Sequence, residues 1–234
     1  MSEWGDNLSS RELSAAIFDM DGLMFDTERL GWRLLNQAGA EFGCEPLSME
    51  RYTQAIGKTH QETQKIFSEM CNGDSATYHA IEARFWELDR DYINRIGPPK
   101  KLGLVELLDL LRSNNIPCAL ASSTRTVRVE EHLKAAQLDR YFQVVVGGDQ
   151  AGASKPAPDI FLLAAEKLGQ PASSCLILED SFAGVQAGHS AGAYVIMVPD
   201  ILQPTPEIRA QADLVVESLN DVVELIKTER LRTY

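Results

Sequence analysis

The length, composition and charge of the chain exclude several classes of protein. Its 234 residues, of which 44% are hydrophobic and 24% charged, are typical of a globular protein with one large domain, or with a core that carries an inserted module. The formal net charge of −12 argues against nucleic acid or an anionic membrane as a partner, and four cysteines without a CxxC pair argue against a zinc site or a disulfide framework.

The N-terminal segment, residues 1–14, has neither the basic start nor the apolar stretch of a secretory signal. Nowhere in the chain do about 18 apolar residues run together, as a membrane-spanning helix requires. We therefore expect a cytoplasmic enzyme.

Five short apolar runs that end in polar or turn residues predict buried strands. They cover residues 15–19, 118–121, 144–146, 175–178 and 194–198. The stretches between the later runs have helical patterns, at 104–112, 127–138, 159–168 and 182–191. This alternation predicts an α/β fold with a doubly wound parallel sheet, in which ligands bind beyond the carboxyl ends of the strands.

Residues 28–96 interrupt the alternation and are predicted to form an inserted α-helical module. Leu30, Leu34, Ala38 and Phe42 recur every four residues, so one helix face should hold them all. Gly97-Pro98-Pro99 then marks the return to the sheet, because glycine and proline end helices. The predicted domains are a core of residues 1–27 and 97–234 and a helical cap of residues 28–96.

Carboxylates follow two of the predicted strands. Asp19 and Asp21 lie two residues apart in Phe18-Asp19-Met20-Asp21-Gly22, and Glu179 and Asp180 follow a later strand. A turn with solvated acids is the simple interpretation of the first motif, because Asp and Gly are common in turns. Four acids converging on one crevice would instead need a cation, and an all-oxygen set of ligands favours Mg²⁺ over Zn²⁺.

Two further polar residues lie at the same predicted edge of the sheet. Ser122 ends one strand, and Lys155 lies in the stiff loop Ser154-Lys155-Pro156-Ala157-Pro158. Taken singly, each is typical of an ordinary turn residue or a solvated charge. Together with the acids they indicate a site for phosphoryl transfer.

The complete set resembles the four motifs of the haloacid dehalogenase superfamily. The matching residues, in order, are Asp19-Met20-Asp21-Gly22, Ser122, Lys155 and Glu179-Asp180. Asp26-Thr27-Glu28 and the segment from Gly184 to Asp200 are similar to the beta-phosphoglucomutase-like phosphatase subgroup, whose core is Rossmann-like and carries a helical cap. Two departures affect loops only: Ser154 replaces the usual glycine, and Lys101-Leu102-Gly103 replaces the usual proline-glycine turn.

The resemblance implies a role for each acid. Asp19 would attack phosphorus to form an aspartyl phosphate. Asp21 would protonate the leaving group and then deprotonate water. Asp19, Asp21 and Asp180 would hold Mg²⁺, with Glu179 either as an additional ligand or as a residue that supports the ligands.

The resemblance also implies which groups bind the transferring phosphate. Ser122, the neighbouring Ser123 and Lys155 would hold its oxygens as charge shifts in the transition state. Asp149 is a weaker candidate for orienting Lys155, and a simple turn role fits it equally well.

Substrate choice is expected to lie in the cap, which would close over the crevice and exclude water. Lys58, in Gly57-Lys58-Thr59-His60, is the predicted substrate contact, whereas a histidine such as His60 is more often a surface residue. The expected partner is a small phosphorylated metabolite such as a sugar phosphate, and no oligomeric state is predicted.

Several other functions are alternatives to a phosphatase. A phosphosugar mutase uses the same core but returns the phosphate to a sugar. A phosphonate hydrolase could use Lys58 as a Schiff base, but Asp21 argues against it and against a true dehalogenase. A receiver-type signalling domain also gathers acids, a hydroxyl and a lysine, yet it needs no inserted cap.

Overall fold

The computed structural model describes residues 12–56, 58, 60–228 and 232–233 of the chain, which forms two compact units. Residues 1–25 and 100–234 make the core unit, and residues 26–99 make the helical unit. The sequence-based cap limits, residues 28 and 96, lie inside the helical unit. Among the described residues, no helix combines the length and the apolar character that crossing a membrane demands.

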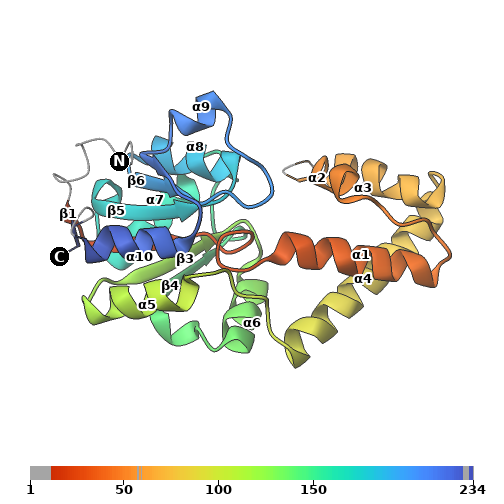
Figure 1. Ribbon diagram of the computed structural model, residues 1–234, viewed down its shortest axis with the longest axis horizontal. Helices are drawn as coiled ribbons and strands as arrows, with labels where there is room; N and C mark the ends of the chain where they lie inside the picture. The colour runs from red at the N-terminus through yellow and green to blue at the C-terminus, as the bar shows by residue number, and fades with distance from the viewer. Residues whose placement is uncertain (1–11, 57, 59, 229–231, 234) are drawn as a thin grey trace. The chain divides into compact units, whose positions relative to one another are not determined.

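The core unit is built on a six-stranded sheet in which every pairing is parallel (Figure 1). Its strands, in spatial order, are β4 (Phe142–Gly147), β3 (Cys118–Ser122), β2 (Ala15–Phe18), β5 (Cys175–Glu179), β6 (Tyr194–Met197) and β7 (Leu214–Val215). A separate parallel pair joins β1 (Glu12–Leu13) to β8 (Arg232–Thr233). The predicted α/β fold with a doubly wound parallel sheet is confirmed.

Helices cover both faces of this sheet, which explains why its central strands are apolar throughout. The helices of the core unit are α5 (Leu104–Ser113), α6 (Thr126–Ala136), α7 (Asp159–Leu168), α8 (Phe182–Ser190), α9 (Pro206–Arg209) and α10 (Leu219–Lys227), with 3₁₀ turns η3 (Asp139–Tyr141) and η4 (Ala172–Ser174). Alternate strand residues point to opposite faces. In β2, Ala16 and Phe18 pack with α5, α6 and α10, whereas Ala15 and Ile17 pack with α7 and α8.

The order of the strands places a binding edge beside β2. From β2 the chain adds β3 and β4 on one side, and then returns to add β5, β6 and β7 on the other. Such a reversal opens a crevice at the carboxyl ends of the strands on either side of it. Phe18 of β2 pairs in register with Leu178 of β5, so the residues that follow both strands emerge side by side.

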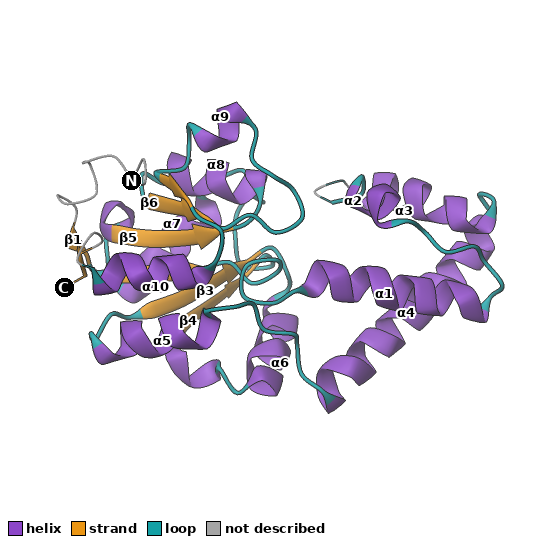
Figure 2. Cartoon of the chain, in the orientation of Figure 1, coloured by secondary structure: helices purple, strands orange, loops and turns teal. Residues whose placement is uncertain are grey.

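The helical unit contains helices and no strand among its described residues (Figure 2). They are α1 (Thr27–Glu41), α2 (Met49–Thr53), α3 (His60–Ser68), η2 (Glu69–Cys71) and α4 (Ser75–Arg95). Leu30, Leu34 and Ala38 are buried on one face of α1, as expected. The prediction for Phe42 was wrong: α1 ends at Glu41, and Phe42 is 44% exposed.

Candidate active site

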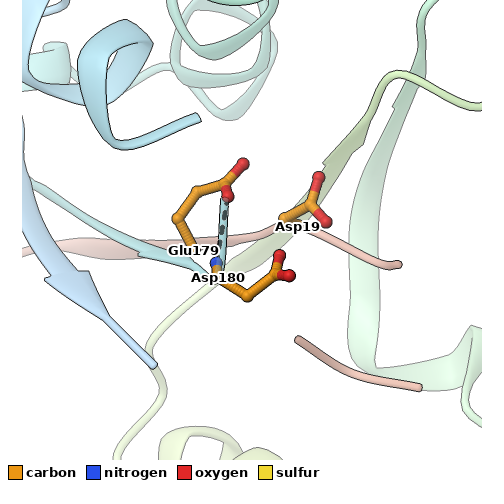
Figure 3. Close-up of side chains that lie close together, drawn as sticks. All are labelled: Asp19, Glu179 and Asp180. Atoms are coloured by element: carbon orange, nitrogen blue, oxygen red, sulfur yellow. Dashed lines mark hydrogen bonds between the residues drawn. The ribbon is translucent and has the colours of Figure 1, made fainter. Parts of the chain in front are cut away.

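Three carboxylates gather where β2 and β5 end. Asp19 directly follows β2, Glu179 is the last residue of β5, and Asp180 comes next. Each of the three offers an oxygen, and these oxygens all lie within 4.8 Å of one another (Figure 3). The in-register pairing of β2 with β5 therefore brings together acids that are 160 residues apart in the sequence.

Lys155 neutralises part of this acidic cluster. Its Nζ donates hydrogen bonds to Asp19 Oδ1 at 2.5 Å, to Glu179 Oε1 at 2.6 Å and to the Ala121 carbonyl at 3.2 Å. These bonds account for the three donors of the ammonium group. The side chain is 5% exposed, and Nζ lies 4.7 Å from the centre of the Phe161 ring. Lys155 is thus held by groups at the ends of three strands, β2, β3 and β5, with its charge against the carboxylate of Asp19.

Glu179 is fully buried and surrounded by donors. Its Oε2 accepts hydrogen bonds from the Asp180 and Ser181 backbone N–H groups and from the Ser181 hydroxyl, at 2.9–3.0 Å, while Oε1 accepts from Lys155. A Cβ atom at Gly184 would lie 1.8 Å from Oε1, so only glycine fits at that turn of α8. Glu179 therefore orients both Lys155 and the loop that carries Asp180.

Asp180 has an environment that suits a cation. Its Oδ1 is buried and has no hydrogen-bond partner among the described residues. Burial, and then the charges of Glu179 and Asp19, raise the pKa of Asp180 well above the usual range. A buried carboxylate oxygen without a donor is costly, unless a positive ligand occupies the position beside it.

Asp19, like Asp180, is a buried carboxylate whose charged form is disfavoured. Burial raises its pKa to about 8, although the charge of Lys155 opposes the rise. The neighbouring Gly22 has φ of +86°, and a Cβ there would lie 2.1 Å from Asp180 Oδ2. The glycine of the first motif is therefore required both by its backbone conformation and by the close approach of Asp180. Oxygen donors of this kind are the ligands that Mg²⁺ prefers.

Asp21 faces hydroxyl groups from the end of β3. Thr124 Oγ1 donates to Asp21 Oδ2 at 2.7 Å, and Ser122 Oγ lies 3.4 Å from the same oxygen. The Ser122 hydroxyl in turn accepts from the Thr124 backbone N–H at 3.0 Å. Ser122 thus lies in the cluster as expected. Thr124 was missed from the sequence, and its position two residues after Ser122 is the signal that could have revealed it.

Asp149, in the loop after β4, binds the start of α6. Its Oδ1 accepts hydrogen bonds from the Thr126 backbone N–H at 2.7 Å and from the Thr126 hydroxyl at 2.8 Å. The backbone bond, and then the hydroxyl bond, lower the pKa of Asp149. Since Asp149 binds the first turn of α6, while Lys155 binds the acids and Ala121, the turn role describes Asp149 better than orientation of Lys155 does.

The two predicted substrate contacts are both exposed. Ser123 lies in the loop directly after β3, in the core unit, and Lys58 lies in the helical unit. The neighbours of Lys58, Gly57 and Thr59, lie outside the described residues, as does the side chain of His60. Residues 1–11, which hold most of the N-terminal segment considered above, are also outside them.

Replacing Asp180 by Asn should stabilise the metal-free protein at pH 8. A carboxyl group whose folded pKa is raised stabilises the fold fully below its unfolded pKa, and this contribution is lost as pH rises through the folded value. Asn carries no charge to lose. We expect the Tm in chelator at pH 8 to rise by about 2–4 °C, the shift that about 1 kcal/mol gives at this size, and the difference to vanish near pH 4.

The matched control for this measurement is Glu130→Gln, which removes an exposed charge from α6 in the same unit. This variant should keep the wild-type Tm at both pH values. A Tm for Asp180→Asn at or below the wild-type value in chelator at pH 8 would show that the Asp180 charge is already compensated without a metal.

Comparisons with known proteins agree with this geometry. The family model described as haloacid dehalogenase-like hydrolase matches residues 16–198. The chain is 33% identical to a probable pseudouridine-5'-phosphatase of Drosophila melanogaster, over 90% of this chain and 92% of that protein. It is 31% identical to a phosphorylated carbohydrates phosphatase of Thermotoga maritima, over 77% of this chain and 82% of that protein.

A solved structure gives the same result for the fold. The putative beta-phosphoglucomutase from Thermotoga maritima superposes with a TM-score of 0.76 at 29% identity, and the match covers 92% of this chain and all of that one. Two longer curated relatives from Arabidopsis thaliana match over only 21% and 54% of their own lengths. The family match spans most of the chain and contains every acid of the site, so this chain belongs to the haloacid dehalogenase-like hydrolases.

Proposed function

We propose that the chain is a Mg²⁺-dependent phosphatase that hydrolyses a small phosphomonoester through an aspartyl phosphate on Asp19. One observation carries the proposal: buried Lys155 holds the Asp19 carboxylate next to Asp180, whose buried Oδ1 has no hydrogen-bond partner among the described residues. This reaction needs a nucleophile, a cation that binds phosphate oxygens and carboxylates that can bind a metal ion. The relatives named as phosphatases support it.

The proposed reaction has two displacements at phosphorus. An oxygen of Asp19 forms a bond to phosphorus while the ester P–O bond breaks, and Asp21 gives its proton to the departing alkoxide. Asp21 then takes a proton from water, whose oxygen attacks phosphorus and releases Asp19. Lys155, Ser122 and the backbone around Ser123 hold the remaining phosphate oxygens throughout.

The residues proposed to hold Mg²⁺ are Asp19, Asp21 through its backbone carbonyl, and Asp180. Glu179 is the fourth acid of the proposed set, although its donors suit it better to orienting Lys155. When bound, the ion would supply positive charge that offsets the repulsion between Asp19 and a phosphate dianion.

The proposed substrate is a sugar phosphate or a similar phosphorylated metabolite. A Thermotoga maritima relative is named for phosphorylated carbohydrates and a Drosophila relative for pseudouridine 5'-phosphate. We propose that the helical unit acts as the cap, that Lys58 contacts the substrate, and that the enzyme is cytoplasmic. Phosphate release from a panel of phosphorylated metabolites with Mg²⁺ tests the proposal, and no release from any of them would refute it.

A phosphosugar mutase is the second candidate, because the solved beta-phosphoglucomutase-like structure resembles this chain. Gly31 occupies the position where the mutase pattern has a histidine. In the helical unit a Cβ at Gly31 would lie 2.7 Å from the Tyr52 hydroxyl, which in turn donates to Glu28 at 3.2 Å. Tyr52 therefore fills the space that a larger side chain at position 31 would need, and this favours the hydrolase.

Hydrolysis is accordingly expected to exceed sugar phosphorylation. Because position 31 holds a glycine and not the histidine of the mutase pattern, Asp21 should activate water, which is in great excess. Given beta-glucose 1-phosphate and a trace of glucose 1,6-bisphosphate, an enzyme that accepts them should release phosphate at least as fast as it forms glucose 6-phosphate. Rapid isomerisation with almost no phosphate released would establish the mutase instead.

Thr124 should act on the reaction by positioning Asp21. Thr124→Val removes the hydroxyl that donates to Asp21 Oδ2 at constant shape, so kcat should fall about tenfold with little change in KM. Thr124→Ser, which keeps the hydroxyl, should restore kcat.

The control is Thr126→Val, which removes a hydroxyl two residues away, at the start of α6, where it pairs with Asp149. It should leave kcat unchanged. If Thr124→Val and Thr124→Ser lower kcat equally, Thr124 has no positioning role toward Asp21.

A further inference from the structure

The core unit has a pocket at the amino ends of its strands, whereas Asp19 lies at their carboxyl ends. The pocket has a volume of about 300 Å³ and is lined by residues at the starts of β3 and β4 and at the end of α5. Figure 1 shows where these elements lie. Leu108, Ile116, Cys118 and Tyr141, all at most 5% exposed, form its floor. Cys118 begins β3 and Ser122 ends it, so the length of the strand, about 13 Å, separates this pocket from the catalytic loop.

Two arginines line this pocket, and both lie near the same aromatic ring. The guanidinium carbons of Arg112 and Arg140 lie 5.8 Å and 5.1 Å from the centre of the Tyr141 ring. Arg140 donates to the Tyr141 hydroxyl at 3.2 Å, and that hydroxyl donates to Asp109 at 2.6 Å. In the part of the chain that the structure describes, neither arginine lies within 4.0 Å of a carboxylate oxygen.

Both arginines therefore lie near one ring on the rim of the pocket, in a protein of net charge −12. The hydrogen bond to Tyr141, and more weakly the charges of Asp109 and Asp139, raise the pKa of Arg140. Cation–π contact with the ring helps to hold both side chains. Among the described residues the guanidinium group of Arg112 has no hydrogen bond, so its N–H donors can bind an oxyanion in a forked geometry.

A β-bulge turns another polar side chain toward the same pocket. The pairing of β3 with β4 shifts between Cys118 and Ala119, so that Gln143 is the extra residue. Its Oε1 accepts the Cys118 backbone N–H at 2.7 Å, which holds the carboxamide and leaves its NH₂ group as a further donor on the rim. Bulges commonly re-aim a side chain in this way beside a functional site.

We propose that this pocket binds a small organic oxyanion, namely a carboxylate or phosphate group on a compact apolar body. The oxyanion binds Arg112 and Arg140, and the apolar body lies against Ile116 and Tyr141. A volume of about 300 Å³ is at the lower end of the usual range for a small-molecule site.

Benzoate is a suitable probe, because it has a planar apolar body and a carboxylate but no phosphoryl group to react. Titrated into ¹⁵N-labelled protein with Mg²⁺, it should shift the amide signals of Cys118, Tyr141 and Gln143 saturably. The signals of Asp19 and Asp180 should stay in place. Benzyl alcohol, which keeps the ring without the charge, should bind at least about tenfold more weakly. Inorganic phosphate, added in a separate titration, shows whether an oxyanion without an apolar body is enough to shift the same amide signals.

Arg112→Ala tests the proposal without endangering the fold, because Arg112 is exposed and the contact with the Tyr141 ring is the side-chain interaction that it makes among the described residues. It should weaken benzoate binding at least about tenfold. The matched control, Arg209→Ala, removes an exposed arginine from α9 of the same unit and should leave binding unchanged. Unaltered affinity in Arg112→Ala, equal binding of benzyl alcohol, or benzoate shifts confined to Asp19 and Asp180 would each overturn the proposal.

Discussion

Asp19→Asn is expected to lower phosphatase turnover by at least about 10⁴-fold, the scale seen when a nucleophile is removed from an enzyme. Asn cannot form an acyl phosphate, and it also loses the charge that pairs with Lys155 at 2.5 Å. No phosphoenzyme should therefore accumulate after acid quench with a labelled ester. The measurement combines steady-state phosphate release with a quench of the first turnover.

Asp21→Asn is the matched variant, because it removes a carboxylate two residues away but leaves the nucleophile. With an activated ester, whose leaving group needs no proton, it should still transfer phosphate to Asp19 and then hydrolyse the intermediate slowly. The two variants should thus fail at different steps. Labelling of Asp19→Asn at the wild-type level would exclude Asp19 as the nucleophile.

Removal of divalent metal is expected to abolish activity, and Mg²⁺ is expected to restore it fully. Among the described residues the buried Oδ1 of Asp180 has no hydrogen-bond partner, and burial, with a smaller contribution from the charges of Glu179 and Asp21, raises the pKa of Asp19 to about 8. A bound cation would offset both effects. Ca²⁺ should support turnover poorly, because its longer and looser coordination misplaces the phosphate relative to Asp19. Turnover is measured in chelator, then with each ion added in excess.

The pH dependence of metal binding provides a second observable. Protons compete with the ion for Asp19, so Mg²⁺ affinity should increase as pH rises toward 8 and level off above it. In Asp180→Asn, Mg²⁺ should no longer raise the Tm of the protein. Full activity in chelator, or a metal affinity that does not change between pH 6 and pH 8, would contradict the assignment of these carboxylates as ligands.

The sequence predicted the inner strands β2, β3, β5 and β6 well because they are buried on both faces. Such strands are almost entirely apolar, and each ends where the chain reaches the polar edge, as at Asp19 and Asp180. The edge strand β7, only Leu214–Val215, was missed, as was the pairing of β1 with β8. Pairs of two residues carry no periodic pattern, so only their partners define them.

The site was predicted by residue type, but its connections were not. The motifs in the sequence identified Asp19, Lys155 and Glu179 as candidate site residues. Only the folded chain shows that the ammonium group of Lys155 bonds to the carboxylates of both Asp19 and Glu179. Thr124 was missed because a single hydroxyl in a loop resembles any turn residue until Asp21 is placed 2.7 Å away. For the same reason the partner of Asp149 could not be chosen from the sequence.

The most direct test of the phosphatase mechanism is to find the phosphoryl group on the protein. Wild-type enzyme with Mg²⁺ and a labelled phosphomonoester is quenched in acid during turnover, digested and analysed by mass spectrometry, with the phosphopeptide reduced by borohydride to mark the acyl phosphate. We expect one modified residue, Asp19, whose phosphorylated form appears and decays as fast as phosphate is released. Phosphate release at the full rate with another residue modified, or with Asp19 unmodified throughout, would contradict it.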